Sequence, residues 1–107
     1  MKFLPLKKKK DFARAVKSGK RRFTASLALV IQPAPEARFA VCVGKKYGKS
    51  VQRNRIKRLL REAFRFHSEK IEVPCHILLI PKVSAQYSYE NFKRDVGIAL
   101  DKEKRNA

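Results

Sequence analysis

Acidic residues are scarce in this sequence, and those present are scattered singly. The chain of 107 residues has nine Asp or Glu residues and two histidines. A protein nuclease needs carboxylates that converge on metal ions, or a pair of histidines acting as acid and base. The acids here form no cluster, and both histidines lie at positions typical of a core or its edge. We therefore expect a chain with no catalytic residues of its own and no tightly bound cofactor.

Cysteine is also rare, and long apolar runs are missing. Cys42 and Cys75 each lie inside an apolar, strand-like run, so we expect reduced core thiols. No pair of Cys or His residues has the C-x-x-C or H-x-x-x-H spacing that lets two ligands share one ion, which argues against a metal site. No segment approaches a membrane span, and the apolar run in Met1–Leu6 is too short for a signal peptide. We expect a cytoplasmic protein.

Positive charge, in contrast, is abundant and unevenly distributed. The net charge is +18, and residues 1–65 hold 20 Lys or Arg against three acids, whereas residues 66–107 hold seven against six. If the positive charge served only solubility, it would be distributed evenly along the chain. This asymmetry therefore indicates one large anionic partner. A membrane surface is the weaker candidate, because a membrane-surface helix has no globular partner for its apolar face, and the rest of this chain supplies one.

The densest basic segment, Gly44–Phe66, has nine Lys or Arg residues and one acid. Its periodicity predicts a helix from about Val51 to His67 with Ser50 as N-cap. The apolar face of this helix combines Ile56, Leu59, Leu60, Ala63, Phe64 and His67. The opposite face carries Asn54, Arg58, Arg61 and Arg65. Guanidinium groups grip phosphate oxygens two at a time, whereas a solvated face normally mixes charge signs, so we expect this face to bind a polyanion.

The loop before this helix, Gly44–Ser50, resembles a nucleotide-binding P-loop. That motif needs four residues between its glycines, and here there are three. No second strand ends in an acid for magnesium, so nucleotide hydrolysis is not expected. Backbone amides and three lysines at a helix N-terminus would still hold a phosphate, which we assign to a nucleic-acid backbone.

The remaining elements follow from apolar periodicity and from Gly, Pro and Ser boundaries. We expect a helix over Lys7–Ser18 that stops at Gly19, followed by an antiparallel hairpin of strands 23–31 and 39–43. After the long helix we expect a strand over 75–80 that is buried on both faces. A last helix should be capped by Ser88, carry Phe92, Val96, Ala99 and Leu100 on one face, and end in a polar tail that frays over 101–107. Without repeats or a linker, residues 1–107 should form one nucleic-acid-binding domain. The order of elements predicts an α/β sandwich with a single mixed sheet and three helices.

The segment Arg53–Phe64 has the spacing R-N-R-x-x-R-x-x-R-x-x-F and follows Lys45-Lys46 and Gly48. In this pattern the chain resembles the protein subunit of bacterial ribonuclease P. The resemblance extends to a Leu- and Lys-rich opening, Asp11-Phe12 in a short helix, a hairpin, an apolar strand and a final helix, so it spans nearly the whole domain. It implies a strand–helix–strand unit with a left-handed crossover. We follow this implication, although crossovers between parallel strands are generally right-handed.

The resemblance implies a ribonucleoprotein that removes the 5′ leader from precursor transfer RNA. The implied partners are a catalytic RNA subunit, which requires magnesium, and the precursor itself; we expect the free protein to be a monomer. Together, the loop, the arginine stripe and the resemblance predict RNA contacts by Lys45, Lys46, Lys49, Arg53, Asn54, Arg55, Lys57, Arg58, Arg61 and Arg65. A leader cleft between the sheet and the first and long helices would be lined by Phe12, Val16 and Leu29. The family commonly has a second phenylalanine where this chain has Val16, so base stacking there should be weakened or absent.

The same residues are compatible with other functions. By themselves, the residues indicate a binder of RNA or DNA backbone. A ribosomal-type structural RNA-binding protein would need the same basic helix but no leader cleft. A helix-turn-helix DNA reader would need a short partner helix before its recognition helix, whereas a strand and a basic loop precede Val51. Weak binding of single-stranded RNA in a groove, beside tight binding of a large structured RNA, would favour the ribonuclease P function.

Overall fold

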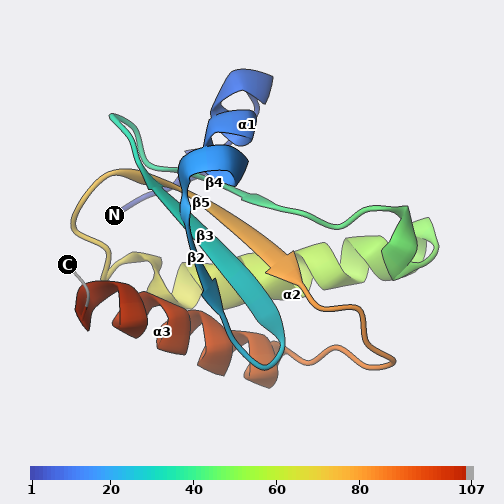
Figure 1. Cartoon of the computed structure of the whole chain (residues 1–107). Coiled ribbons are helices and arrows are strands. Elements are labelled where there is room, and N and C mark those ends of the chain that lie inside the picture. The colour runs from blue at the N-terminus through green and yellow to red at the C-terminus, as the bar shows by residue number, and fades with distance from the viewer. Residues whose placement is uncertain (106–107) are drawn as a thin grey trace.

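The computed structural model describes the backbone of residues 1–105 and the side chains of residues 1–102. Within this range the elements are β1 (Leu4–Pro5), α1 (Lys9–Ser18), β2 (Lys20–Phe23), β3 (Leu27–Pro33), β4 (Arg38–Val41), the 3-10 helix η1 (Lys45–Tyr47), α2 (Ser50–Ser68), β5 (Cys75–Pro81) and α3 (Tyr89–Arg105). The strands form one mixed sheet in the order β1-β4-β5-β3-β2. Helices α2 and α3 cover one face of the sheet, and α1 lies across the other (Figure 1). The predicted α/β sandwich with a single mixed sheet and three helices is confirmed.

The strand pairing differs from the prediction in two ways. The expected strand over 23–31 is instead divided between the last residue of β2, a turn at residues 24–26 and the first part of β3. In this turn the Thr24 N–H donates to Leu27 O at 2.9 Å. The expected hairpin between this segment and residues 39–43 does not form, because β5 lies between β3 and β4. Strand β5 runs antiparallel to β3 and parallel to β4. A strand that is apolar on both faces is most stable in the centre of a sheet, and this preference separates its two neighbours.

Strands β4 and β5 are parallel and joined through α2, which is the strand–helix–strand unit that the resemblance implied, and the handedness of its crossover stays a prediction. Strand β1 is also parallel to β4. Strand β1 was not predicted, because two residues are too few to show an alternating pattern. It extends the sheet beyond β4, with Leu4 aligned to Arg38.

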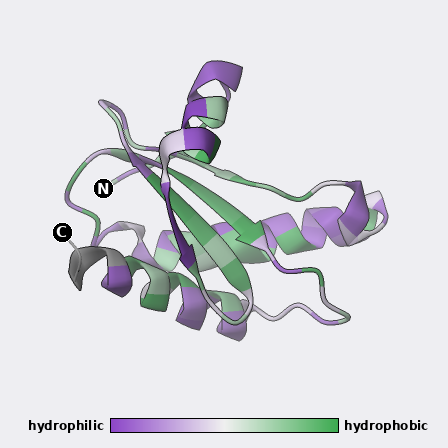
Figure 2. Ribbon diagram, viewed as in Figure 1, coloured by the Kyte–Doolittle hydropathy of each residue, from purple (hydrophilic) through white to green (hydrophobic). Residues whose placement is uncertain are grey.

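Two apolar clusters form, one on each face of the sheet, and Figure 2 shows the apolar strands between the more polar outer surfaces of the helices. The larger cluster packs α2 and α3 against the sheet residues Leu27, Leu29, Ile77 and Leu79. The smaller packs Leu6, which follows β1, and Ala15 of α1 against Val30 and Leu78, with Phe12, Ala40, Cys42 and Ile80 at its margin. Successive strand residues point to opposite faces, so the parity of the residue number within each strand decides which cluster a side chain joins.

The first helix begins at Lys9, two residues later than predicted, and ends before Gly19. The backbone of Gly19 is extended, with φ of −69°, so its role is not a left-handed cap. A Cβ atom there would lie 2.5 Å from Ala15 O and 2.6 Å from Val30 Cγ1. Glycine is therefore required because the chain passes from α1 into β2 in close contact with β3.

The predicted N-cap residue is wrong for α2 and confirmed for α3. Helix α2 already includes Ser50; its N-cap is Lys49, which has no capping side-chain bond, so the predicted Ser50 cap is wrong. The Ser50 hydroxyl instead accepts a hydrogen bond from Arg53 Nη2 at 3.1 Å. The Ser88 cap of α3 is confirmed, since its Oγ accepts from the Asn91 N–H at 3.3 Å. Helix α3 continues through Arg105 rather than ending near residue 101, and residues 106–107 of the predicted tail lie outside the described residues.

A buried carboxylate on α3 fixes the β2–β3 turn. Asp95 is 1% exposed and accepts hydrogen bonds from the Ser26 N–H at 2.8 Å, from Ser26 Oγ, and from Arg94 Nε at 3.0 Å. Burial by itself raises the pKa of Asp95, but the hydrogen bonds from Arg94 and Ser26 outweigh burial and hold the pKa below its ordinary value. The ionised form is thus the one that the fold stabilises.

We expect Asp95→Asn to lower the free energy of unfolding by about 1–3 kcal/mol near neutral pH, because charge-assisted bonds to the turn are lost. A lowered pKa contributes stability above the unfolded value of about 3.9, and this contribution disappears as the pH falls through the lower folded value. Urea unfolding of both proteins at about pH 7 and about pH 3 should therefore show a smaller difference at the acidic pH. An equal difference at both pH values would contradict this assignment.

Candidate nucleic-acid interface

The buried face of α2 is the one predicted from the sequence. Ile56, Leu60 and Phe64 are at most 1% exposed. The Phe64 ring stacks on Phe39 with centroids 4.5 Å apart and meets the edge of Phe3 at 5.0 Å. Leu59 and His67 complete this face as half-buried residues, and Ala63 is buried. These contacts fix the rotation of α2 about its own axis.

The opposite face of α2 is consequently held toward solvent. Asn54, Arg58, Arg61 and Arg65 are all exposed, as predicted. Among the described side chains, the ion pairs are Arg38–Glu36 and Arg94–Asp95, and neither involves this face. The guanidinium groups therefore retain their full hydrogen-bonding capacity for an external anion.

The basic loop is held by a buried aromatic residue that the sequence reasoning did not assign a role. Tyr47 is 4% exposed, and its hydroxyl donates to Pro81 O at the end of β5. Gly48 follows with φ of 115°, in the region that favours glycine, and its N–H donates to Lys45 O at 3.1 Å. This compact turn directs Lys45 and Lys49 outward. The signal in the sequence was a lone aromatic residue among lysines.

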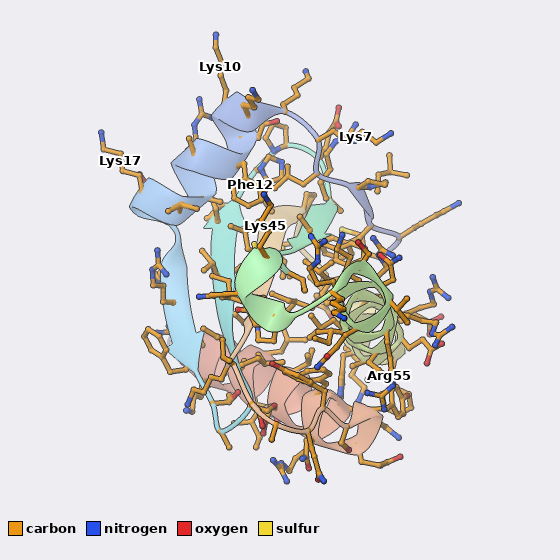
Figure 3. All side chains as sticks on the ribbon, turned by 90° about the vertical axis from the view of Figure 1, so that its right-hand side faces the viewer. Lys7, Lys10, Phe12, Lys17, Lys45 and Arg55 are labelled. Atoms are coloured by element: carbon orange, nitrogen blue, oxygen red, sulfur yellow. The ribbon has the colours of Figure 1, made fainter. Side chains whose placement is uncertain are left out.

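Most of the ten predicted RNA-contact residues are exposed on the basic loop and on α2, which follows it directly in the chain. The exposed ones are Lys45, Lys46, Lys49, Asn54, Arg55, Arg58, Arg61 and Arg65. Figure 3 shows Lys45 on η1 and Arg55 on α2. Arg53 and Lys57 are half-buried. Arg53 is held by Ser50 and supports the start of α2 as well as adding charge.

The predicted leader cleft is only partly assembled from the predicted residues. Phe12 is half-buried and packs at the margin of the α1 cluster, and in Figure 3 it lies under α1 while Lys45 extends from η1 in the direction of that helix. Val16 is 42% exposed on α1. Leu29 is a correction, because it is fully buried in the cluster under α2 and α3. Its parity places it on the opposite face of the sheet from α1.

The sequence prediction did not include the residues that the strands carry on the α1 face of the sheet. They occupy the alternate positions of the strands and comprise Phe23, Ala28, Cys42 and Ile80, of which Phe23 is 62% exposed. Strand parity relative to Leu27 and Leu29 was the signal that could have identified Ala28. The turn at residues 24–26 hid the position of Phe23, because small residues there continued the alternating pattern.

The remaining candidate sites are the cavities, the two cysteines, possible metal ligands and possible membrane-spanning helices. A cavity of about 670 Å³ lies between the end of α2, β3 and α3, and one of about 310 Å³ lies beside the β2–β3 turn; neither is lined by Phe12 or Val16. Neither Cys42 nor Cys75 is in a disulfide, as expected. Within the described part of the chain, no three His, Cys, Asp or Glu side chains gather in a group able to hold a metal ion, and no helix is long and apolar enough to cross a membrane.

Comparison with known proteins gives a consistent result. The model of the family Ribonuclease P matches residues 1–104. The ribonuclease P protein component of Syntrophus aciditrophicus is 33% identical over 104 residues, which cover 94% of this chain and 87% of that protein. That of Dictyoglomus thermophilum is 39% identical over 80 residues, 72% of this chain and 66% of that protein. The solved RNase P protein of Staphylococcus aureus superposes with a TM-score of 0.81 at 27% identity, covering 96% of this chain and 97% of that structure. The chain therefore belongs to the ribonuclease P protein family.

Proposed function

We propose that this chain is the protein subunit of a ribonuclease P whose RNA subunit, with magnesium, performs the hydrolysis. In this proposal the basic loop and the exposed face of α2 bind the RNA subunit, and the α1 face of the sheet binds the 5′ leader of precursor transfer RNA. The observation that supports it best is the arginine stripe of α2, which is exposed, forms no ion pair with any described side chain and follows three exposed lysines of the loop. Family membership supports the same function.

The chemistry of the two surfaces suits two different parts of an RNA. The loop and α2 offer cations with little apolar surface, which suits the phosphates of a large folded RNA. The α1 face combines the Phe12 ring with partly exposed aliphatic side chains, which suits unpaired bases that stack or pack. This second surface favours the leader-binding function over a ribosomal-type protein, which would need only the first.

The leader surface that we propose differs from the predicted one. Phe12 remains its aromatic residue, Val16 can offer only an aliphatic contact, and the partly exposed Ile80 replaces Leu29 as the residue of the sheet. The protein would hold the leader and add binding energy to the precursor, while no proton or metal is handled by its own side chains. We further propose that the free protein is a monomer and acts in the cytoplasm.

Reconstitution with a ribonuclease P RNA tests this function. The protein alone should release no leader at any magnesium concentration. Added to the RNA subunit, it should improve the use of precursors with a leader of several nucleotides far more than that of a nearly leaderless precursor. Phe12→Ala should remove much of this difference, about 1–3 kcal/mol in leader affinity if a base stacks on the ring. Its affinity for the RNA subunit should stay unchanged.

Phe12→Leu is the matched control, because it keeps apolar packing under α1 but has no aromatic ring. If Phe12 is only a core residue, Phe12→Ala should lower stability and affect precursors with long and short leaders alike. That outcome, with the wild-type leader advantage intact, would remove Phe12 from the leader surface. A wild-type protein with no preference for long leaders would contradict the proposed function itself.

A further inference from the structure

A row of apolar side chains crosses four strands on the α1 face of the sheet. The register aligns Phe23 of β2 with Ala28 of β3, and Ala28 with Ile80 of β5. Cys42 continues the row just past β4, where its N–H donates to Leu79 O at 2.8 Å. Directly aligned residues of neighbouring strands share a face. With about 4.8 Å between strands, this sheet row of Phe23, Ala28, Ile80 and Cys42 spans about 14 Å.

The sheet row lies one step along the strands from the residues that α1 covers. Val30 and Leu78 are fully buried in the cluster with Ala15, whereas Ile80 and Cys42 are partly exposed and Phe23 is 62% exposed. Helix α1 therefore covers one end of this face. Within the sheet row Ala28 is buried at 7% exposure, and Phe23, Ile80 and Cys42 are the accessible side chains. The open row needs an occupant that is apolar on one side.

The ring of Phe23 is accessible to such an apolar occupant. The other strongly exposed aromatic ring, Phe66, already has Lys93 Nζ 4.0 Å from its centroid. Among the described residues, Phe23 has no aromatic or cation–π partner, and its only side-chain neighbour by hydrogen bond is Lys102, whose Nζ donates to the backbone carbonyl of Phe23 at 3.2 Å. This bond holds the end of β2 without covering the ring.

Charge identifies the class of occupant. At one end, Cys42 leads within three residues to Lys45 of the basic loop. At the other end, Arg21 lies on the same face of β2 as Phe23, where its Nη2 donates to Val16 O at 3.3 Å. An apolar strip with an exposed ring and cations at both ends is the arrangement by which proteins bind unpaired nucleotides, because bases pack on the strip and phosphates pair with the cations.

We propose that Phe23 is a base-stacking platform at the far end of the leader-binding surface. This inference rests on the proposed function, and it adds a residue and a direction. Because the loop and α2 face the RNA subunit in that function, the Cys42 end of the sheet row lies nearest to it and Phe23 lies farthest away. Phe23 therefore contacts leader nucleotides distal to the cleavage site, and only leaders long enough to cross the sheet reach it.

The test measures precursor affinity of the reconstituted holoenzyme over a series of increasing leader length. Phe23→Ala should weaken binding of long-leader precursors about fivefold or more and leave short-leader precursors unchanged. The leader length at which the loss begins should be longer than for Phe12→Ala. Phe23→Tyr should behave as wild type, and Phe23→Leu should resemble Phe23→Ala. Val73→Ala, which alters a residue 67% exposed in the segment before β5, is the control for exposed apolar surface.

Each outcome decides the question. If wild type prefers long leaders and Phe23→Ala equals it at every length, this inference is overturned while the proposed function stands. If wild type has no preference for long leaders, the proposed function and this inference fail together. A Phe23→Leu protein that equals wild type would overturn stacking. Unchanged leader affinity with altered sedimentation of free Phe23→Ala would assign the ring to self-association instead. Comparing Tyr with Leu keeps the test valid even if Phe23→Ala folds poorly.

Discussion

Leu60→Ala is expected to lower the free energy of unfolding by about 2–5 kcal/mol, because it leaves a cavity in a core that cannot fully collapse. Leu60 is fully buried in the cluster between α2, α3 and the sheet. Arg58→Ala and Arg61→Ala should change the same quantity by no more than about 0.5 kcal/mol, since both side chains are exposed and neither is ion-paired within the part of the chain that the structure describes. Urea or thermal unfolding of the three variants measures this contrast.

The same three variants should rank in the opposite order for RNA binding. Arg58→Ala and Arg61→Ala should each weaken binding to the RNA subunit by about 1–3 kcal/mol, through loss of charge-assisted contacts with phosphate. Leu60→Ala should bind normally wherever it remains folded. Glu62→Ala is a matched control on the exposed surface of α2 and should weaken neither property. If Arg58→Ala unfolded the protein and Leu60→Ala did not, the assignment of the two faces of α2 would be wrong.

Affinity for the RNA subunit should fall steeply and linearly with salt on logarithmic axes. Each neutralised phosphate contributes about 0.7–0.9 to the slope, so about six contacts predict a slope near −5. A fourfold rise in monovalent salt would then reduce the affinity by about a thousandfold, the largest effect that we expect. The reason is the release of counterions from the RNA by the 20 Lys or Arg residues of the first 65 positions. Binding titrations at fixed magnesium measure the slope.

Charge variants provide the control for this measurement. Arg58→Ala should make the slope shallower by about one, because one phosphate contact is lost. Lys82→Ala changes an exposed lysine that follows β5, outside the loop and α2, and should leave the slope unchanged. A wild-type slope near −1 would contradict the proposal that phosphate neutralisation dominates the affinity.

The sequence by itself determined the rotation of α2 and the distribution of charge. An amphipathic helix is specified locally, because residues three and four apart share a face whatever the helix packs against. The burial of Leu60 and the exposure of Arg58 therefore follow from spacing alone. The Ser88 cap and the doubly buried strand β5 were predictable for the same reason, since each depends on a short run of neighbouring residues.

Only the tertiary structure decided the strand pairing and the residues of the leader surface. Pairing joins segments far apart in the chain, so no local pattern could show that β5 separates β3 from β4. The local pattern shows that Leu29 and its neighbour Ala28 point to opposite faces of one strand. It does not show which of the two faces α1, because that depends on where α2 and α3 pack. The exposure of Phe23 likewise depends on the chain reversal at residues 24–26 and on the fact that α1 does not cover this end of the sheet. Spacing along the chain fixes what one element presents, whereas its neighbours in space determine which side remains open to a ligand.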